Sequence, residues 1–335
     1  MKRELFFYRY EDNGRDKNPV YPKSFREGEF YKSKRMCGVE IEAVNPKYLY
    51  LQAQKEVQSI KQFKVNDYCD SEVKKLIHTD GEEFFEKSKL FYDRLHYINE
   101  NVSHSTDAGG LEIQTPPASG LEFERNMYGF CDVLQDYGFT GSNSCGGHIH
   151  LDLNKDYDND KLVRLADFYI GFEKWIYSVL PKWRRVSNWC TKIGTTVDTT
   201  KELKKIKEEN QITQYNLFTN LWNSKIGSGK SHGFNLGFSL NNGITNKHIE
   251  LRYHEGTVNP LDFIHWATIH TSVLDFVSKN SESANGRKYL NEITDYMQRN
   301  KIGFYKIQTI LRKDILIEKE TLKHFVNRHK RFLKQ

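Results

Sequence analysis

Four short segments of the sequence alternate apolar residues with acids or histidines, which is the pattern of half-buried β-strands. Successive side chains of a strand point to opposite faces, so each segment has one apolar and one polar face. Stacked in one sheet, the segments would form a core on one side and an array of carboxylates and imidazoles on the other. They are CGVEIEAV from Cys37, GGLEIQTPP from Gly109, CGGHIHLDL from Cys145 and KHIELRYHEGT from Lys247.

The polar face of such a sheet would concentrate negative charge. Like charges at short range raise the free energy of the folded state unless cations neutralise them. The pattern therefore predicts a cavity on the sheet that holds metal ions. Its side chains would be Glu40, Glu42, Glu112, His148, His150, Asp152, Glu250 and Arg252.

The composition is that of a soluble globular protein. The chain has 335 residues, 38% of them hydrophobic and 28% charged, and no run reaches the roughly 18 apolar residues of a membrane helix. The N-terminal segment lacks the apolar stretch of a signal peptide. Five cysteines without CxxC spacing indicate a reducing compartment. We therefore expect a cytoplasmic protein without a membrane partner, from a bacterium or a phage-infected bacterial cell.

The net charge of +6 is only mildly basic, and most of the excess lies within residues 312–335. Nucleic-acid-binding domains are usually more basic. We do not expect nucleic acid as a partner, although the basic C-terminus leaves that question open.

Alternating strands favour an antiparallel or mixed sheet over a buried parallel one. Helical patterns follow, for example after Asn259-Pro260, an N-cap with proline at the first helical position. The predicted fold is α+β, with helices on the outer face of the sheet and a polar concave face inside. We expect a catalytic domain at 1–280, a polar helical insertion in it at about 46–105, and a basic helical extension at 281–335 packed on it.

The carboxylates of Glu40 and Glu42 would lie about 6.5–7 Å apart along their strand. At that spacing each can hold a different cation, or both can share one. Oxygen ligands favour Mg²⁺ or Mn²⁺. The alternative is an exposed strand whose charges only confer solubility.

The two histidines of the third segment allow more than one interpretation. His148 and His150 could bind zinc with Cys145, Asp152 or His254 as the third ligand, or could be a hydrogen-bonded pair within the sheet. We interpret His150 as a ligand in the carboxylate cavity and His148 as a residue that lines it. For a Cys145 nucleophile with His148 as its base, proximity is the only support.

Cationic residues near these strands predict phosphate binding. Arg252 stands beside Glu250, and its planar guanidinium matches phosphate geometry; the alternative is a surface salt bridge. Gly227–Ser231 resembles part of a P-loop, but position 224 is serine and a strand follows where a helix should begin. Lys230 could still contact a phosphate, or the loop could simply be flexible.

Four segments of the sequence resemble, in their order, the motifs of the amidoligase family. They are GVEIE, LE-x-x-TPP preceded by Asp107, GGHIHLD, and IELRYHEGT followed by a helix with Trp266. That family belongs to the glutamine synthetase and glutamate–cysteine ligase superfamily of carboxylate–amine ligases. The resemblance covers roughly residues 36–275. It implies a curved antiparallel sheet whose concave face binds ATP and two or three Mg²⁺ ions, with Mn²⁺ as an alternative. The implied partners are ATP, a carboxylate and an amine, drawn from amino acids, peptides or proteins.

The resemblance also implies roles for individual residues. Arg252 would contact the transferred phosphoryl group, and Asn235, which fits a family asparagine, the nucleotide or its phosphates. Lys230 is a phosphate-binding candidate from its glycine-rich loop alone. Arg184 or Arg185, which follow Trp183, would hold a substrate carboxylate or a phosphate. The chemistry itself also requires a general base to take the amine proton, for which Glu112, Asp107 and His148 are the candidates. The metal ligands would be Glu40, Glu42, Glu112, His150 and Glu250.

The sequence therefore leaves three functions open. The first is an amide-forming ligase that uses ATP and Mg²⁺ and passes through an acyl phosphate. The second is a metal-dependent hydrolase centred on His148 and His150. The third is a catalytically inactive ligase-like module whose basic C-terminal helices dock nucleic acid or a protein.

Overall fold

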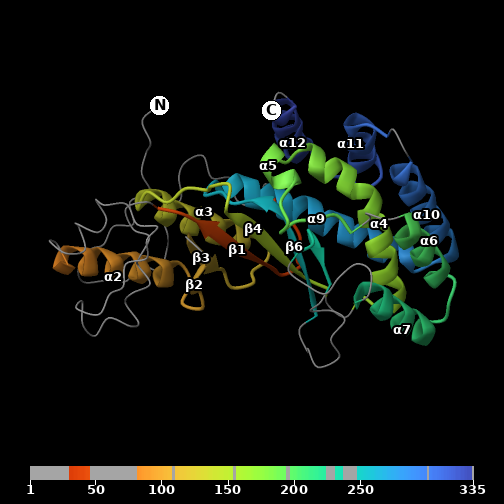
Figure 1. Ribbon diagram of the computed structural model, residues 1–335, viewed down its shortest axis with the longest axis horizontal. Helices are drawn as coiled ribbons and strands as arrows, with labels where there is room; N and C mark the ends of the chain where they lie inside the picture. The colour runs from red at the N-terminus through yellow and green to blue at the C-terminus, as the bar shows by residue number, and fades with distance from the viewer. Residues whose placement is uncertain are drawn as a thin grey trace.

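The protein combines helices with a single antiparallel sheet, which confirms the α+β class (Figure 1). This architecture comes from a computed structural model. The residues that the structure describes are 30–45, 81–107, 110–153, 156–193, 197–223, 231–236, 247–299 and 302–333.

The sheet has six strands in the order β2-β3-β1-β4-β6-β5, and every neighbouring pair is antiparallel. The four predicted strands form as β1, β3, β4 and β6, and they occupy adjacent positions in the sheet. The bounds are β1 Cys37–Ala43, β2 Ser103–Asp107, β3 Gly110–Gln114, β4 Gly146–Asp152, β5 Phe234–Asn235 and β6 His248–Glu255.

The register of these strands brings the polar residues of different motifs side by side. Glu40 of β1 stands opposite His148 of β4. His150 of β4 stands opposite Glu250 of β6, and Asn235 of β5 pairs with the same Glu250. Because directly opposed residues share a face of the sheet, the pairing alone gathers the predicted ligands in one place.

Helices make up most of the rest of the described chain. Asn259 caps α9 through its side chain, which accepts a hydrogen bond from the backbone N–H of Leu261 at 3.3 Å, and Pro260 follows at the first helical position, as predicted. The helices are α2 Gly81–Ile98, α3 Gly120–Asp136, α4 Asn159–Ser178, α5 Lys182–Arg185, α6 Val197–Ile206, α7 Gln211–Leu221, α9 Pro260–Ser281, α10 Ala284–Gln298, α11 Phe304–Lys313 and α12 Lys319–Phe332.

The core lies on the apolar side of the sheet. Val39, Ile41, Ile149 and Leu151 are buried and belong to one hydrophobic cluster with side chains of α3, α4 and α9. Burying one such side chain stabilises the fold by about 1.5–3 kcal/mol. This apolar cluster can therefore support an array of charges on the opposite face. None of the helices within the described ranges is long and apolar enough to cross a membrane.

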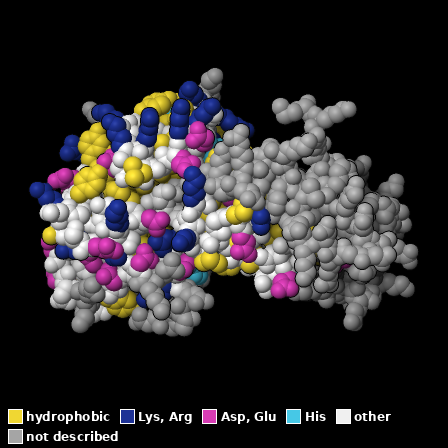
Figure 2. Space-filling model, turned by 180° about the vertical axis from the view of Figure 1, so that it is seen from behind, with side chains coloured by type: hydrophobic (Ala, Val, Ile, Leu, Met, Phe, Trp, Pro, Cys, Tyr) yellow, Lys and Arg dark blue, Asp and Glu magenta, His cyan; other side chains and the backbone are white. Residues whose placement is uncertain are grey.

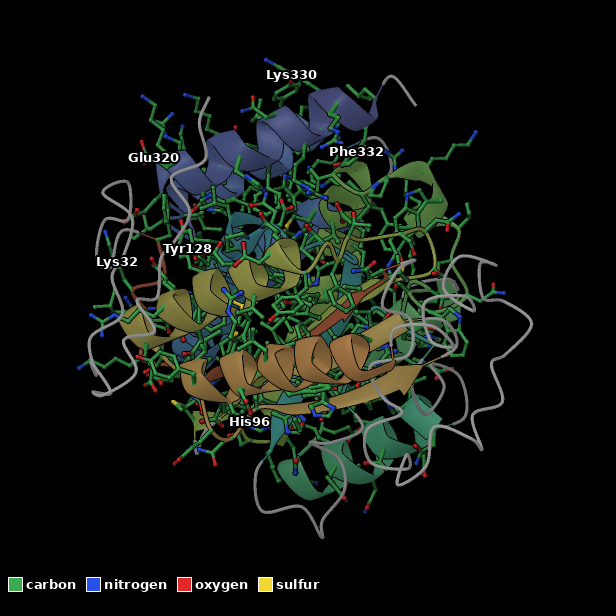
Figure 3. All side chains as sticks on the ribbon, turned by 90° about the vertical axis from the view of Figure 1, so that its left-hand side faces the viewer. Lys32, His96, Tyr128, Glu320, Lys330 and Phe332 are labelled. Carbon is green, nitrogen blue, oxygen red and sulfur yellow. The ribbon has the colours of Figure 1, made fainter. Side chains whose placement is uncertain are left out.

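Helix α12 packs on the C-terminal end of α4. Arg328 donates to the carbonyl of Val179 at 3.3 Å, and His329 Nδ1 lies 2.9 Å from the carbonyl of Ser178. The last carbonyls of a helix lack partners within it and attract cationic side chains. The opposite side of α12 faces solvent, with Glu320 and Lys330 pointing away from the body (Figure 3). Lys and Arg side chains line this edge of the molecule in Figure 2.

Candidate active site

Strand β1 presents its two glutamates as the alternation predicts. Val39 and Ile41 are fully buried, whereas the side chains of Glu40 and Glu42 are 18% and 19% exposed. The backbone N–H of Gly146 in β4 donates to a carboxylate oxygen of Glu42. Both carboxylates are thus accessible from the polar face and oriented by the neighbouring strand.

His148 lies among three glutamates. Its Nδ1 is 2.6 Å from Glu40 Oε2 and 3.8 Å from Glu250 Oε1, and its Nε2 is 3.4 Å from Glu42 Oε1. Only 2% of its side chain is exposed. The sequence places His148 on the cavity wall, and the structure shows that it joins the carboxylates of three residues on two strands.

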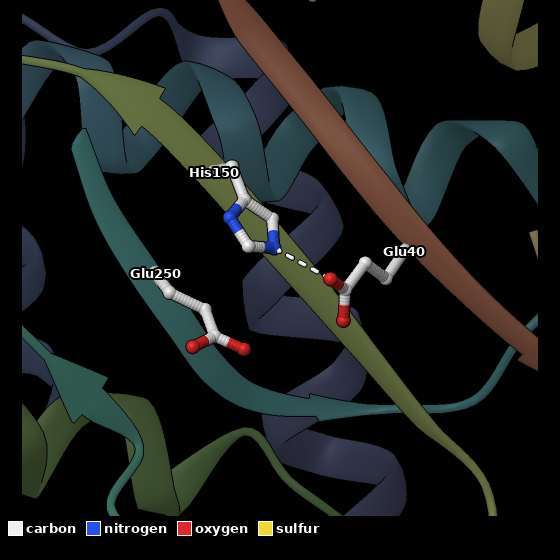
Figure 4. A group of neighbouring side chains, drawn as sticks. All are labelled: Glu40, His150 and Glu250. Atoms are coloured by element: carbon white, nitrogen blue, oxygen red, sulfur yellow. Dashed lines mark ion pairs between the residues drawn. The ribbon is translucent and has the colours of Figure 1, made fainter. Parts of the chain in front are cut away.

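Three predicted ligands converge beside it. The potential ligand atoms of Glu40, His150 and Glu250 all lie within 4.8 Å of one another, and His150 Nε2 is 3.2 Å from Glu40 Oε1. Figure 4 shows these side chains reaching into one space from β1, β4 and β6. The two carboxylates suit Mg²⁺ or Mn²⁺, and the imidazole is also a common zinc ligand, so the identity of the metal stays a prediction.

Glu250 is held by two donors. Arg252 Nη1 donates to its Oε1, and Asn235 Nδ2 donates to its Oε2 at 2.8 Å. Burial raises the pKa of Glu250, but the nearby charges of Arg252 and the two histidines outweigh it, so the net shift is downward. Glu250 is therefore a carboxylate anion at neutral pH.

Glu40 is anionic for a related reason. Burial acts to raise its pKa, but hydrogen bonds with His148 and His150 hold that pKa well below its usual value. Both carboxylates that face His150 therefore carry charge when the protein is folded.

The shift of Glu40 predicts a pH dependence of stability. Its pKa is lower in the folded chain than the value of about 4.3 in an unfolded one. Its contribution is then fully present above that pH and lost as the pH falls further. In the presence of a chelator, we expect the Tm of Glu40→Gln to fall less steeply with acidification than that of the native chain.

The measurement is circular dichroism melting over a pH series that spans about pH 4.3. Glu122→Gln serves as the control, because Glu122 is exposed on α3. Parallel curves for the native chain and Glu40→Gln would contradict the assigned shift.

Glu112 lies beside this group, on the next strand. Its Cα pairs with that of Glu42, and its Oε1 accepts from Gln114 Nε2 at 2.8 Å and lies 3.4 Å from Ser105 Oγ. Its role as a metal ligand or base stays a prediction. Asp107 ends β2, and its side chain lies outside what the structure describes, as does Lys230 altogether.

The two candidate arginines diverge. Arg184 is buried and donates to the carbonyls of Arg252 at 2.6 Å and Tyr253 at 3.2 Å. A Cβ on Gly146 would meet both Arg184 Nη2 and His148 Nε2 at 2.9 Å, so Arg184 borders the glutamate group. Arg185 instead donates to the carbonyls of Leu180 and Phe332 and links α5 to α12.

His254 does not join the site. Alternation along β6 would put it on the polar face with Glu250 and Arg252, but the pairing of β4 and β6 shifts between Gly147 and Ile149. Its ring is buried in the helical layer, 3.1 Å from the carbonyl of Gly147. An extra residue in β6 turns the side chain of His254 to the other face of the sheet. The alternative in which His254 completes a zinc site is therefore wrong.

The other proposed partners of the histidines lie elsewhere. The thiol of Cys145 is 3.2 Å from Ser142 Oγ, and Asp152 stands opposite His248 at the end of β4. No contact between Cys145 and His148 supports a nucleophile–base pair among the described residues.

The family model of amidoligase enzymes, Amidoligase_2, matches residues 33–274. This chain belongs to the amidoligase family. The matched region contains all six strands and most of α9, whereas α10, α11 and α12 lie beyond it. A comparison with curated proteins finds no match. The family and the extent predicted from the motifs are confirmed.

Two features of the site, both at Gly146, were not predicted from the sequence. The N–H of Gly146 orients Glu42, and Gly146 has no space for a side chain beside Arg184 and His148. The paired glycines before His148 were the available signal, because glycine permits such close approach.

Proposed function

We propose that the protein is an ATP- and Mg²⁺-dependent carboxylate–amine ligase that forms an amide through an acyl phosphate. The observation that carries the proposal is the convergence of Glu40, His150 and Glu250 within 4.8 Å, with the guanidinium of Arg252 bonded to Glu250. Anionic metal ligands beside an arginine suit a metal-bound polyphosphate. Membership of the amidoligase family supports amide formation.

The chemistry requires activation of a carboxylate, which is a poor acyl donor because oxide is a poor leaving group. A carboxylate oxygen of the substrate attacks the γ-phosphorus of ATP, and ADP leaves. The amine then attacks the acyl carbon, the C–O bond to phosphate breaks, and the nitrogen loses a proton. Mg²⁺ bound by Glu40, His150 and Glu250 would neutralise phosphate charge and align the two anions.

The chain's own residues provide orientation and charge. Arg252 would stabilise negative charge on the transferred phosphoryl group, and Asn235 keeps Glu250 in its orientation. Arg184 borders the same group, but it is buried and already donates to two backbone carbonyls, so its role in holding a substrate carboxylate stays a prediction.

The proton of the amine needs an acceptor. His148 is nearly inaccessible and bonded to Glu40, whereas Glu112 is partly exposed at the edge of the site. We therefore favour Glu112 over His148 as the general base.

Thermal melting with ADP or ATP, with and without Mg²⁺, tests the proposal. A ligand at 100 times its Kd stabilises a fold by about 2.7 kcal/mol, so we expect a Mg²⁺-dependent rise in Tm for the native chain and for Glu122→Gln. Glu40→Gln should lose that rise. If no nucleotide raises the Tm of the native chain in Mg²⁺, the ligase proposal fails.

The hydrolase alternative is weakened by the position of His254. Both ring nitrogens of His148 also lie near carboxylates, so His148 is already engaged; the imidazole that lies beside His150 is that of His248, with the two ring centroids 5.3 Å apart. Stoichiometric zinc in the purified protein, found by metal analysis, would restore that alternative.

A further inference from the structure

A buried chain of three side chains connects the helical layer to the backbone of β4. The hydroxyl of Tyr169 in α4 lies 2.9 Å from His270 Nδ1, and His270 Nε2 lies 3.0 Å from His254 Nε2. His254 Nδ1 lies 3.1 Å from the carbonyl of Gly147. All three side chains are buried, and none takes part in the proposed reaction.

The hydrogen atoms in this series of hydrogen bonds have one consistent arrangement. A carbonyl only accepts, so Nδ1 of His254 carries a hydrogen and donates it to Gly147. The Nε2 of a neutral His254 then accepts from His270 Nε2, and His270 Nδ1 accepts from the hydroxyl of Tyr169. Burial lowers the pKa of His254 well below its usual value and that of His270 to about 3, so both imidazoles are neutral.

A β-bulge makes the chain of hydrogen bonds reach the site. Gly147 opposes His254 and Ile149 opposes Leu251, so two residues of β6 stand opposite the single His148. Bulges redirect side chains and are common near active sites. Arg252 remains beside Glu250, while His254 turns toward His270.

The peptide that His254 contacts is the one that carries His148. A peptide unit is planar, so holding the Gly147 carbonyl also fixes the amide and Cα of His148. Gly146 and Gly147 are the most flexible residues of β4. The strand pairing of Gly147 with Ile41 and His254 holds them on both sides. The hydrogen bond from the His254 ring adds a further restraint where the N–H of Gly146 reaches Glu42 and the ring of His148 reaches Glu40.

We propose that Tyr169, His270 and His254 are positioning residues that hold the Gly147–His148 peptide and thereby the orientation of Glu40 and Glu42. The proposal rests on the proposed function only where catalysis is the readout. Mn²⁺ affinity tests it independently of turnover, and the imidazole tautomers test it independently of metal binding as well, so a failure of the ligase proposal can be told apart from a failure of this one.

The decisive variants are His254→Leu, which removes the donor to Gly147, and His254→Asn, whose amide can replace Nδ1. Calorimetric titration with Mn²⁺ alone should show an affinity about 10-fold lower for His254→Leu, the lower end of the range for outer-shell partners. His254→Asn should recover most of it. His265→Leu is the matched control. His265 is buried in α9, as His270 is, but it lies against Thr321 of α12 and outside the series of hydrogen bonds that reaches Gly147.

Nitrogen-15 NMR of labelled imidazoles provides the second readout. We expect the hydrogen of His254 on Nδ1 and that of His270 on Nε2. Tyr169→Phe removes one hydroxyl and little volume, so it should fold even if His254→Leu does not, and it should weaken Mn²⁺ binding in the same direction. The proposal is overturned if folded His254→Leu binds Mn²⁺ with native affinity. If His254→Leu does not fold, native affinity in Tyr169→Phe overturns it. A hydrogen on Nε2 of His254 in the native protein also overturns it. If ATP turnover is detected, kcat should fall more than KM changes.

Discussion

Arg252→Met is expected to lower kcat/KM about 1000-fold, the upper range for loss of one charge-stabilising donor, while its affinity for Mn²⁺ stays at least native. The two effects separate because Arg252 contacts the Glu250 carboxylate without being a metal ligand itself. Its removal deprives the phosphoryl group of a cation, yet it makes the ligand cluster more negative. Initial rates of ADP release and Mn²⁺ titration measure the two quantities.

Glu250→Gln is the complementary variant. It removes a negative charge from the cluster of Glu40, His150 and Glu250, so we expect both Mn²⁺ affinity and turnover to fall.

Arg252→Lys should recover little of the turnover that Arg252→Met loses, because an ammonium lacks the planar fork of guanidinium.

Arg312→Met, on the exposed side of α11, controls for a general loss of positive charge. Arg252→Met also leaves a buried carboxylate with one fewer partner, so the Tm of this variant should fall. The assays should therefore be run at a temperature well below that Tm. Turnover close to native in folded Arg252→Met would remove this residue from the mechanism, and a loss of Mn²⁺ binding would assign it to the metal site.

The sequence predicts the part of the site that depends on strand alternation. Glu40, Glu250 and His150 lie on the polar face because their neighbours are apolar and buried, which is a property of each strand alone. The same holds for the start of α9, where Asn259 and Pro260 act locally.

Features that depend on pairing between distant segments were not predictable. Strand β2 has the sequence SHSTD, with no apolar residue, and it forms because β3 offers it a partner. The direction of His254 depends on an extra residue in the register of β6 against β4. Likewise, Arg184 and Arg185 are adjacent in sequence, and only the packing of α5 separates their surroundings.

Lys207→Met is expected to destabilise the fold by about 3–5 kcal/mol, the cost of leaving one member of a buried ion pair alone. Lys207 Nζ lies 2.5 Å from Asp167 Oδ2, and the two side chains are 5% and 1% exposed. Gln298 of α10 also donates to Asp167 at 2.8 Å. The pair therefore connects α4 with the segment after α6 and with α10, and its loss leaves a carboxylate without its cation.

The chain supplies a matched control three residues away. Lys204 Nζ lies 2.8 Å from Asp295 Oδ1, but these side chains are 47% and 51% exposed, so Lys204→Met should cost less than about 1 kcal/mol. The double variant Lys207→Met with Asp167→Asn should be more stable than Lys207→Met alone, since no buried charge remains. Chemical denaturation monitored by circular dichroism measures all three. Equal losses for Lys204→Met and Lys207→Met would mean that water reaches Asp167 and that its burial does not set the cost.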